Sequence, residues 1–156
     1  MCIRDSLLTT PASESDSQQP VARFEFPRVV RWVDTDMSGF AHVSAYVRMM
    51  EETEYAFLRS RGLSVKLTDD KGVMGFPRLH ASVSVAQPLV FEQQVIVYLS
   101  LTELDGKSIF YEFEIRDRDD QVRATGKFKV ALCRFPDEKP PYAILTPEYV
   151  IEALSG

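Results

Sequence analysis

Cysteine, histidine and basic charge are all scarce in this chain of 156 residues. Its two cysteines, Cys2 and Cys133, are too few for a disulfide framework, and with two isolated histidines they cannot assemble a metal site. No apolar run approaches the roughly 20 residues that a membrane-spanning helix needs. The net charge of −5 provides no overall field that would attract nucleic acid. These absences predict a cytoplasmic protein with no metal, no membrane span and no nucleic-acid partner.

The rest of the composition is that of an ordinary globular chain, with 45% hydrophobic and 26% charged residues. Residues 1–20 are polar, poor in aromatics and without periodicity, so we expect a disordered head. Residues 1–6 also resemble a translated sequencing adapter. We therefore predict one domain over residues 21–156, since this length suits a single core.

One long helix is predicted near the start of this domain. Tyr46, Met50, Thr53 and Phe57 recur with helical spacing and form one stripe, and Gly62 suits the left-handed position that ends a helix. The result is about five helical turns. Before it, residues 23–32 mix apolar and polar side chains like a strand, and a proline at position 27 favours the edge of a sheet.

The remainder of the chain predicts antiparallel strands. Apolar and polar residues alternate over 79–86, 95–102, 109–116 and 122–132, with turns at 105–106 and 117–120 and a loop over 69–72. Thr146 followed by Pro147 is typical of a helix start and predicts a short terminal helix ending near Leu154. The expected fold is therefore α+β, with a curled antiparallel sheet of about five strands wrapped around one long helix.

The segment between the first strand and the long helix has a layout that suits acyl transfer. Asp34 and Asp36 lie in a turn, Gly39 allows close backbone approach, and the helix begins near Val43 and Ser44 with unpaired N–H groups. Acyl transfer needs a base or nucleophile beside hydrogen-bond donors for a developing oxyanion. The same residues also occur in turns and helix caps that carry no chemistry.

The motif Arg31-Trp-Val-Asp-Thr-Asp-Met-Ser-Gly-Phe-Ala-His-Val-Ser-Ala-Tyr46, with Phe57-Leu-Arg-Ser-Arg-Gly-Leu63 after it, resembles the 4-hydroxybenzoyl-CoA thioesterase family of hotdog proteins. This resemblance implies hydrolysis of an acyl-CoA thioester, with CoA present only as part of the substrate and no other cofactor. It also implies a homo-oligomer, a dimer or a tetramer, with active sites at the subunit junction.

The resemblance further assigns roles to residues of the motif. Asp36 would attack the thioester carbonyl or act as base for water, while Asp34 would shape the turn. Backbone N–H groups around His42, Val43 and Ser44 would polarise the carbonyl. This chain has alanine at position 45, where many relatives have asparagine, and the change bears on how substrate is positioned.

Several nearby residues have two readings. His42 could hold the substrate carbonyl or a water, or could simply bond to local backbone. Gly39 would line the substrate site, Tyr46 and Met50 could line an acyl pocket or the core, and Glu51 could serve the site or form a surface pair. For the CoA phosphates the available cations, which could equally be solvated, are Arg78, Lys107, Lys127, Lys129 and Arg134.

Two other functions fit the same pattern. A non-catalytic sensor could bind acyl thioesters in the same pocket, although the presence of Asp36 favours an enzyme. A hotdog dehydratase acting on enoyl thioesters would pair a histidine with a carboxylate, and His42 with Asp36 allows that chemistry.

Overall fold

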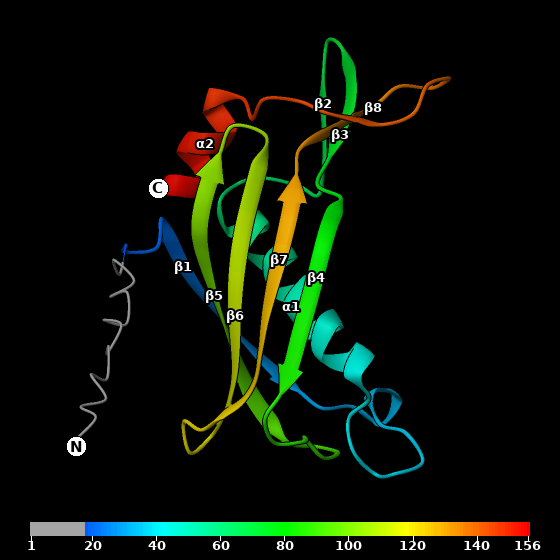
Figure 1. The fold of residues 1–156 in the computed structure, drawn as a ribbon, viewed down its shortest axis with the longest axis vertical. Helices are drawn as coiled ribbons and strands as arrows, with labels where there is room; N and C mark the ends of the chain where they lie inside the picture. Colours follow the sequence, from blue (N-terminus) through cyan, green and yellow to red (C-terminus); the bar gives the residue numbers. More distant parts are fainter. Residues whose placement is uncertain (1–17) are drawn as a thin grey trace, which may run out of the picture.

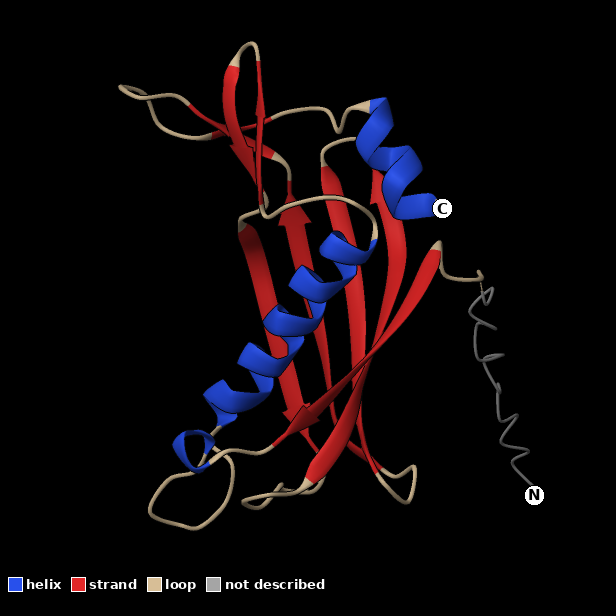
Figure 2. Ribbon diagram, turned by 180° about the vertical axis from the view of Figure 1, so that it is seen from behind, coloured by secondary structure: helices blue, strands red, loops and turns tan. Residues whose placement is uncertain are grey.

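The computed structural model describes residues 18–156, so the head predicted for residues 1–20 lies almost wholly outside the described residues. A long helix lies against one face of a curled antiparallel sheet (Figures 1 and 2). The elements in chain order are β1 (Ala22–Val29), the 3-10 helix η1 (Trp32–Asp34), α1 (Val43–Ser60), β2 (Lys66–Asp69), β3 (Gly72–Gly75), β4 (Arg78–Val85), β5 (Gln94–Asp105), β6 (Ser108–Asp117), β7 (Val122–Ala131), β8 (Cys133–Phe135), β9 (Tyr142–Ala143) and α2 (Glu148–Ser155). The predicted α+β arrangement is confirmed.

The main sheet has five strands in the order β1-β5-β6-β7-β4. Strands β5, β6 and β7 form a meander, and β1 and β4 close its two edges. Pro27 lies in β1 opposite Ile96 of β5, at the edge that its missing N–H predicts. The five predicted strands are therefore present, with the first ending at Val29 rather than at Trp32, which begins η1.

Helix α1 buries the predicted stripe against the sheet. Tyr46, Met50, Thr53 and Phe57 are each at most 1% exposed. Removing side chains as large as Met50 and Phe57 from water stabilises the fold by about 1.5–3 kcal/mol each. The sheet makes room for them at Gly126 of β7, where an added Cβ would lie 2.5 Å from the Met50 sulfur. Gly62 follows the helix with φ +72°, which confirms its place at the left-handed end.

The alternation in β5 and β6 produces the other side of the core. The inward residues are all at most 3% exposed, namely Val95, Val97, Leu99, Leu101, Ile109, Tyr111, Phe113 and Ile115. The turn at Asp105–Gly106 joins these strands, as predicted. The hairpin register places the apolar faces of both strands under α1. The position of the helix on the sheet therefore depends on the alternating pattern of the strands as well as on the apolar stripe of the helix.

Strand β4 departs from this pattern. Its apolar residues were expected to face the core, but Leu79 is 57% exposed and Val85 42% exposed. The strand pairs only with β7 among the described residues, so its outer backbone edge is free. An edge strand with exposed apolar side chains is a surface that natural proteins usually cover.

A second, smaller sheet was not expected from the sequence. It has the order β2-β3-β8-β9 and projects from one end of the molecule (Figure 1). The predicted loop at 69–72 is only the tight turn between β2 and β3, and the last long strand ends at Ala131 before the chain enters β8. Arg134 of β8 binds both carboxylate oxygens of Asp69, at 2.9 and 3.0 Å, and so links β8 to β2 across the intervening β3.

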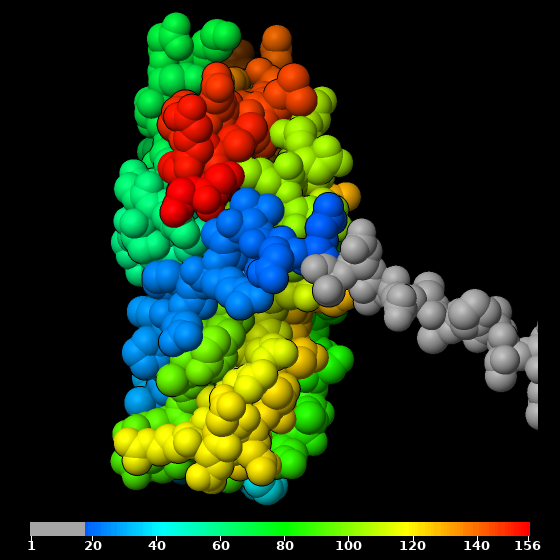
Figure 3. All heavy atoms as spheres, turned by 90° about the vertical axis from the view of Figure 1, so that its left-hand side faces the viewer, coloured from blue at the N-terminus to red at the C-terminus, as the bar shows by residue number. Residues whose placement is uncertain are grey.

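The terminal helix α2 packs over the same end, beside β1 and α1, and is the red element in Figure 3. It buries Val150 and Leu154. Its N-cap is Pro147, not Thr146 as predicted, and the buried Thr146 hydroxyl has no hydrogen-bond partner in the part of the chain that the structure describes. The helix begins one residue later than the capping pattern suggests, and the Thr146 N–H instead donates to the Gly106 carbonyl at 2.8 Å. Among residues 18–156, no helix combines the length and the apolar character needed to cross a membrane.

Candidate active site

The turn that carries Asp36 is held from within by Asp34. The Asp34 side chain is 4% exposed and accepts hydrogen bonds from the backbone N–H of Arg31 at 2.8 Å and from the Arg48 guanidinium at 2.9 Å. Its backbone carbonyl accepts from the N–H of His42 at 2.7 Å. One buried residue therefore ties together the end of β1, the start of α1 and the turn between them, which is the structural role expected for Asp34.

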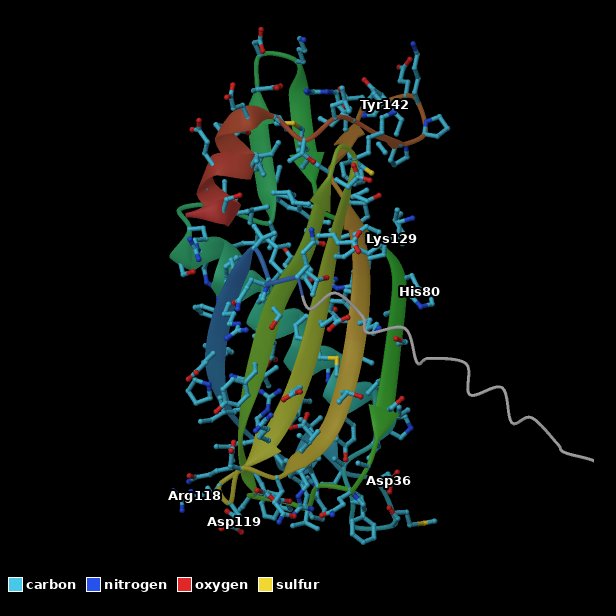
Figure 4. The ribbon with its side chains drawn as sticks, turned by 60° about the vertical axis from the view of Figure 1, so that its left-hand side comes forward. Asp36, His80, Arg118, Asp119, Lys129 and Tyr142 are labelled. Atoms are coloured by element: carbon cyan, nitrogen blue, oxygen red, sulfur yellow. The ribbon has the colours of Figure 1, made fainter. Side chains whose placement is uncertain are left out.

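Asp36 itself is exposed at the tip of this turn, at the lower end of the molecule in Figure 4. Its Oδ1 accepts hydrogen bonds from the Ser38 N–H, at 2.8 Å, and from the Ser38 hydroxyl. Its Oδ2 has no hydrogen-bond partner within the described part of the chain. The Ser38 hydroxyl, the Ser38 N–H and the nearby His42 hold the pKa of Asp36 below its ordinary value. The carboxylate is therefore ionised at neutral pH, with one oxygen free to react.

The turn closes through Gly39 and is anchored to the segment after β4. Gly39 has φ +84°, a conformation that favours glycine, and its N–H bonds the Asp36 carbonyl at 3.0 Å. Phe40 then pairs with Val90 in an isolated bridge, and the Ala41 N–H donates to the Leu89 carbonyl at 2.8 Å. These bonds place Asp36 beside the β4 end of the sheet.

The start of α1 supplies fewer free donors than the sequence suggests. His42 is the N-cap, and its Nδ1 accepts from the Ser44 N–H at 3.2 Å and lies 2.9 Å from the Ser44 hydroxyl. The His42 N–H is bonded to Asp34, so two of the three predicted oxyanion donors, His42 and Ser44, are already engaged. The Val43 N–H has no hydrogen-bond partner over residues 18–156 and is the donor that remains.

Two of the predicted substrate-binding residues lie in the core. Tyr46 is 1% exposed, and its hydroxyl accepts the Leu89 N–H at 3.0 Å. Met50 is fully buried against Gly126. Both side chains therefore pack in the core beneath the start of α1, and in a single copy of the chain neither lines an open pocket.

Glu51, the third helix residue predicted to bind substrate, is half-buried and has protein partners. The Tyr55 hydroxyl lies 3.0 Å from its Oε1, and the Arg78 guanidinium lies 3.4 Å from its Oε2. Arg78 was a candidate for binding CoA phosphates, but its side chain is only 18% exposed and is committed to carboxylates. The structure therefore removes Arg78 from the available cations.

A buried carboxylate that the sequence did not single out lies one turn further along α1. Glu54 is completely buried and bonds Arg78 at 2.7 Å. Burial raises the pKa of Glu54 to about 7, against the opposing effect of Arg78. No signal in the sequence marks it, because Glu51, Glu52 and Glu54 follow one another on one helix and only packing tells which of them is enclosed.

The molecule has two large surface hollows, and both lie away from Asp36. A hollow of about 760 Å³ lies on the outer face of the main sheet, and one of about 790 Å³ lies between β1, β5 and the β6–β7 turn. Neither is lined by Asp36. No group of three or more His, Cys, Asp or Glu side chains among the described residues is arranged to hold a metal ion.

Comparison with known proteins places this geometry in a family. Residues 30–142 match the thioesterase-like superfamily, and this range contains the Asp36 turn and all of α1. A relative from Aquifex aeolicus (strain VF5), which is named as an esterase, is 30% identical over 99 residues, 64% of this chain and 77% of the relative.

Solved structures agree with the sequence match. A 1,4-dihydroxy-2-naphthoyl-CoA thioesterase from Synechocystis has a TM-score of 0.73 at 20% identity and covers 85% of this chain and 96% of its own. A gentisyl-coenzyme A thioesterase has a TM-score of 0.72 at 25% identity, over 84% of this chain and 99% of its own. The resemblance predicted from the motif is confirmed: the chain belongs to the thioesterase-like superfamily of hotdog-fold thioester hydrolases.

Proposed function

We propose that this protein hydrolyses an acyl-CoA thioester to the free acid and CoA, with Asp36 as the catalytic carboxylate. The observation that carries the proposal is the exposed, ionised Asp36 with an unbonded Oδ2, set beside a helix start whose Val43 N–H is unpaired among the described residues. A reactive oxygen and a donor for the developing oxyanion are the two parts that acyl transfer requires.

Two routes use these groups. In the nucleophilic route, Oδ2 of Asp36 attacks the thioester carbonyl carbon, the C–S bond breaks, and the CoA thiolate leaves and takes up a proton. Water then hydrolyses the mixed anhydride and restores the carboxylate. In the base route, Asp36 takes a proton from a water whose oxygen attacks the same carbon, the C–S bond breaks, and the CoA thiolate leaves and takes up that proton from Asp36. In both, the Val43 N–H would donate to the carbonyl oxygen as it gains negative charge.

Ser38 and His42 have supporting parts in this proposal. Ser38 fixes the rotamer of Asp36 by binding Oδ1, which leaves Oδ2 as the reactive oxygen. The Nδ1 of His42 is occupied by the helix cap, so only the other ring nitrogen, Nε2, could reach a substrate carbonyl or water.

A cytoplasmic location fits a chain whose Cys133 is a free, buried thiol.

A panel of thioesters tests the proposal. We expect thiol release from acyl-CoA esters, and the names of the two solved relatives make esters of hydroxylated aromatic acids the first to include beside short and long aliphatic ones. Saturable binding without thiol release would support the acyl-thioester sensor instead, and loss of an enoyl double bond would support the dehydratase. Inertness toward every acyl-CoA and acyl-carrier thioester would overturn the hydrolase.

Self-association through β4 is the second part of the proposal. The strand has a free edge and exposed apolar side chains, which a second copy would cover by antiparallel pairing across a twofold axis. Such pairing puts the Arg78 end of one β4 beside the Val85 end of the other. The Asp36 turn is bonded to the segment after Val85, so the partner's strand would complete the site.

Light scattering on the purified protein tests this part. We expect a dimer or a multiple of it, and Leu79→Lys should shift the population toward monomer and lower activity, because it places a charge on the pairing surface. Leu145→Lys is the matched control, since Leu145 is 69% exposed and lies outside β4. A monomeric wild type, or an equal effect of both substitutions, would contradict pairing through β4.

A further inference from the structure

The interior between α1, β4 and β6 contains a cluster of polar groups far along the helix from Asp36. Glu54 comes from α1, Arg78 from β4 and Tyr111 from β6, and Glu54 and Tyr111 are at most 1% exposed. Three atoms of this cluster are buried without a hydrogen-bond partner among the described residues: Glu54 Oε1, Arg78 Nε and the Tyr111 hydroxyl oxygen. Unpaired buried polar atoms are rare and carry a free-energy cost, so three in one place require a physical reason.

The charges of the cluster do not balance when every group is ionised. One guanidinium, that of Arg78, lies 2.7 Å from Glu54 and 3.4 Å from Glu51. It also donates to the Tyr55 hydroxyl at 3.4 Å and lies over the rings of Tyr55 and Phe128, at 5.2 and 4.9 Å, and these groups bring no negative charge. Two carboxylates therefore share one cation, and the cluster has one negative charge in excess unless it binds a proton.

Within the described part of the chain, strands β6 and β7 bring no further positive charge to the cluster. From β6 the group that faces it is Tyr111, whose pKa is raised well above its ordinary value by burial and by Glu54. The nearest cations of β7, Lys127 and Lys129, face the opposite side of the sheet, where Lys127 pairs with Glu112 and Lys129 lies over Phe110. A proton on one of the two carboxylates would remove the excess negative charge.

Burial decides which carboxylate holds that proton. The Glu51 side chain is 38% exposed and can be solvated, while the Glu54 side chain is fully enclosed. An ionised carboxylate in an enclosed site is destabilised far more than one that reaches water. The Glu54 Oε1 is buried without a hydrogen-bond partner among the described residues, and an unpaired oxygen costs less free energy on a neutral carboxyl group than on a charged one.

We propose that Glu54 is a proton-binding residue at the junction of helix α1 and edge strand β4, and that its ionisation inside this enclosed junction makes the fold less stable. The junction lies where β4 begins, and the register of β4 against β7 shifts between Arg78 and His80 at the same point. The proposal rests on packing inside one chain and is independent of the role of Asp36.

The sign of the pH dependence follows from linkage. Glu54 has an ordinary pKa of 4.5 and a pKa of about 7 in the fold, so the folded state binds the proton more tightly. The contribution of neutral Glu54 is complete at acid pH and is lost as pH rises through about 7. Between pH 5 and pH 8 the folding equilibrium constant of the wild type should fall by about 50- to 100-fold relative to a variant that cannot ionise at this position.

Glu54→Gln is that variant, since glutamine keeps the shape and remains neutral. Denaturant unfolding from pH 5 to pH 8 should show that the free energy of unfolding of Glu54→Gln increases relative to that of the wild type as pH rises. Glu51→Gln is the matched control on the same helix: it retains the pH dependence and moves its midpoint to lower pH, because a neighbouring negative charge is removed. Parallel curves for wild type and Glu54→Gln would overturn the proposal.

A direct titration keeps the test independent of how well the variant folds. The carboxyl carbon resonances of the ¹³C-labelled wild-type protein should include one glutamate that titrates near neutrality, and Glu54→Gln assigns it. Amide exchange at β4, corrected for intrinsic rates, should rise over the same pH range. Titration of every glutamate near its ordinary pKa would refute a proton on Glu54.

Discussion

Asp36→Asn is expected to lower kcat for thioester hydrolysis by about 10²- to 10⁴-fold while leaving the stability of the fold unchanged. Asparagine has nearly the same shape and can still accept the two bonds from Ser38, so the turn is retained. It cannot act as a nucleophile through a carboxylate oxygen or take a proton from water. Because Asp36 is exposed, thermal unfolding should show the same midpoint for both proteins.

Ser38→Ala is the control for this substitution. It removes the hydroxyl that lowers the pKa of Asp36, yet a carboxylate with an ordinary pKa of 3.8 is still ionised at neutral pH. Most activity should therefore remain at pH 7, and the acid limb of the pH–rate profile should move to higher pH. Full turnover by Asp36→Asn on the best substrate of the panel would remove Asp36 from the mechanism.

The fold could be predicted from the sequence where one local pattern determines one face. The stripe from Tyr46 to Phe57 has helical spacing, and every residue of it is buried in the observed helix. The hairpin at Asp105–Gly106 has turn residues between two alternating segments, and it forms there. Alternation did not predict burial where contacts between distant parts of the chain decide it. Strand β4 alternates like a core strand, but it lies at an edge of the sheet and leaves Leu79 exposed.

The small sheet escaped prediction for a related reason. Its strands are two to four residues long, which is too short for an alternation of apolar and polar residues to be recognised. They are held together by contacts between distant parts of the chain, such as Arg134 with Asp69. Neither residue predicts the other from sequence position.

The candidate site shows the same division. The turn, the glycine and the helix start could be predicted, because each has local chemistry. The bonding state of the individual donors could not, since the His42 N–H is taken by a carbonyl eight residues earlier in the chain. Together with the bond from the Ser44 N–H to the His42 ring, this bond leaves Val43 as the oxyanion donor in the proposal.

Asp34→Ala, unlike Asp36→Asn, is expected to destabilise the fold, by about 2–4 kcal/mol. The substitution removes two charge-assisted hydrogen bonds, from the Arg31 N–H and the Arg48 guanidinium, and each such bond contributes roughly 1.5–3 kcal/mol. Water can solvate Arg48 again, because its side chain is 45% exposed, and this recovers part of the loss. Denaturant unfolding measures the difference.

Asp36→Ala is the matched control, two residues away in the same turn. It removes a carboxylate of the same size from an exposed position, so its free energy of unfolding should stay within about 0.5 kcal/mol of the wild type. Activity should fall in both variants, in Asp36→Ala through the chemistry and in Asp34→Ala through a displaced turn, and added stabilising osmolyte should restore it only in the second. Equal stability of the two variants would mean that the buried carboxylate does not hold the turn, and the distinct roles given to the two aspartates would have to be abandoned.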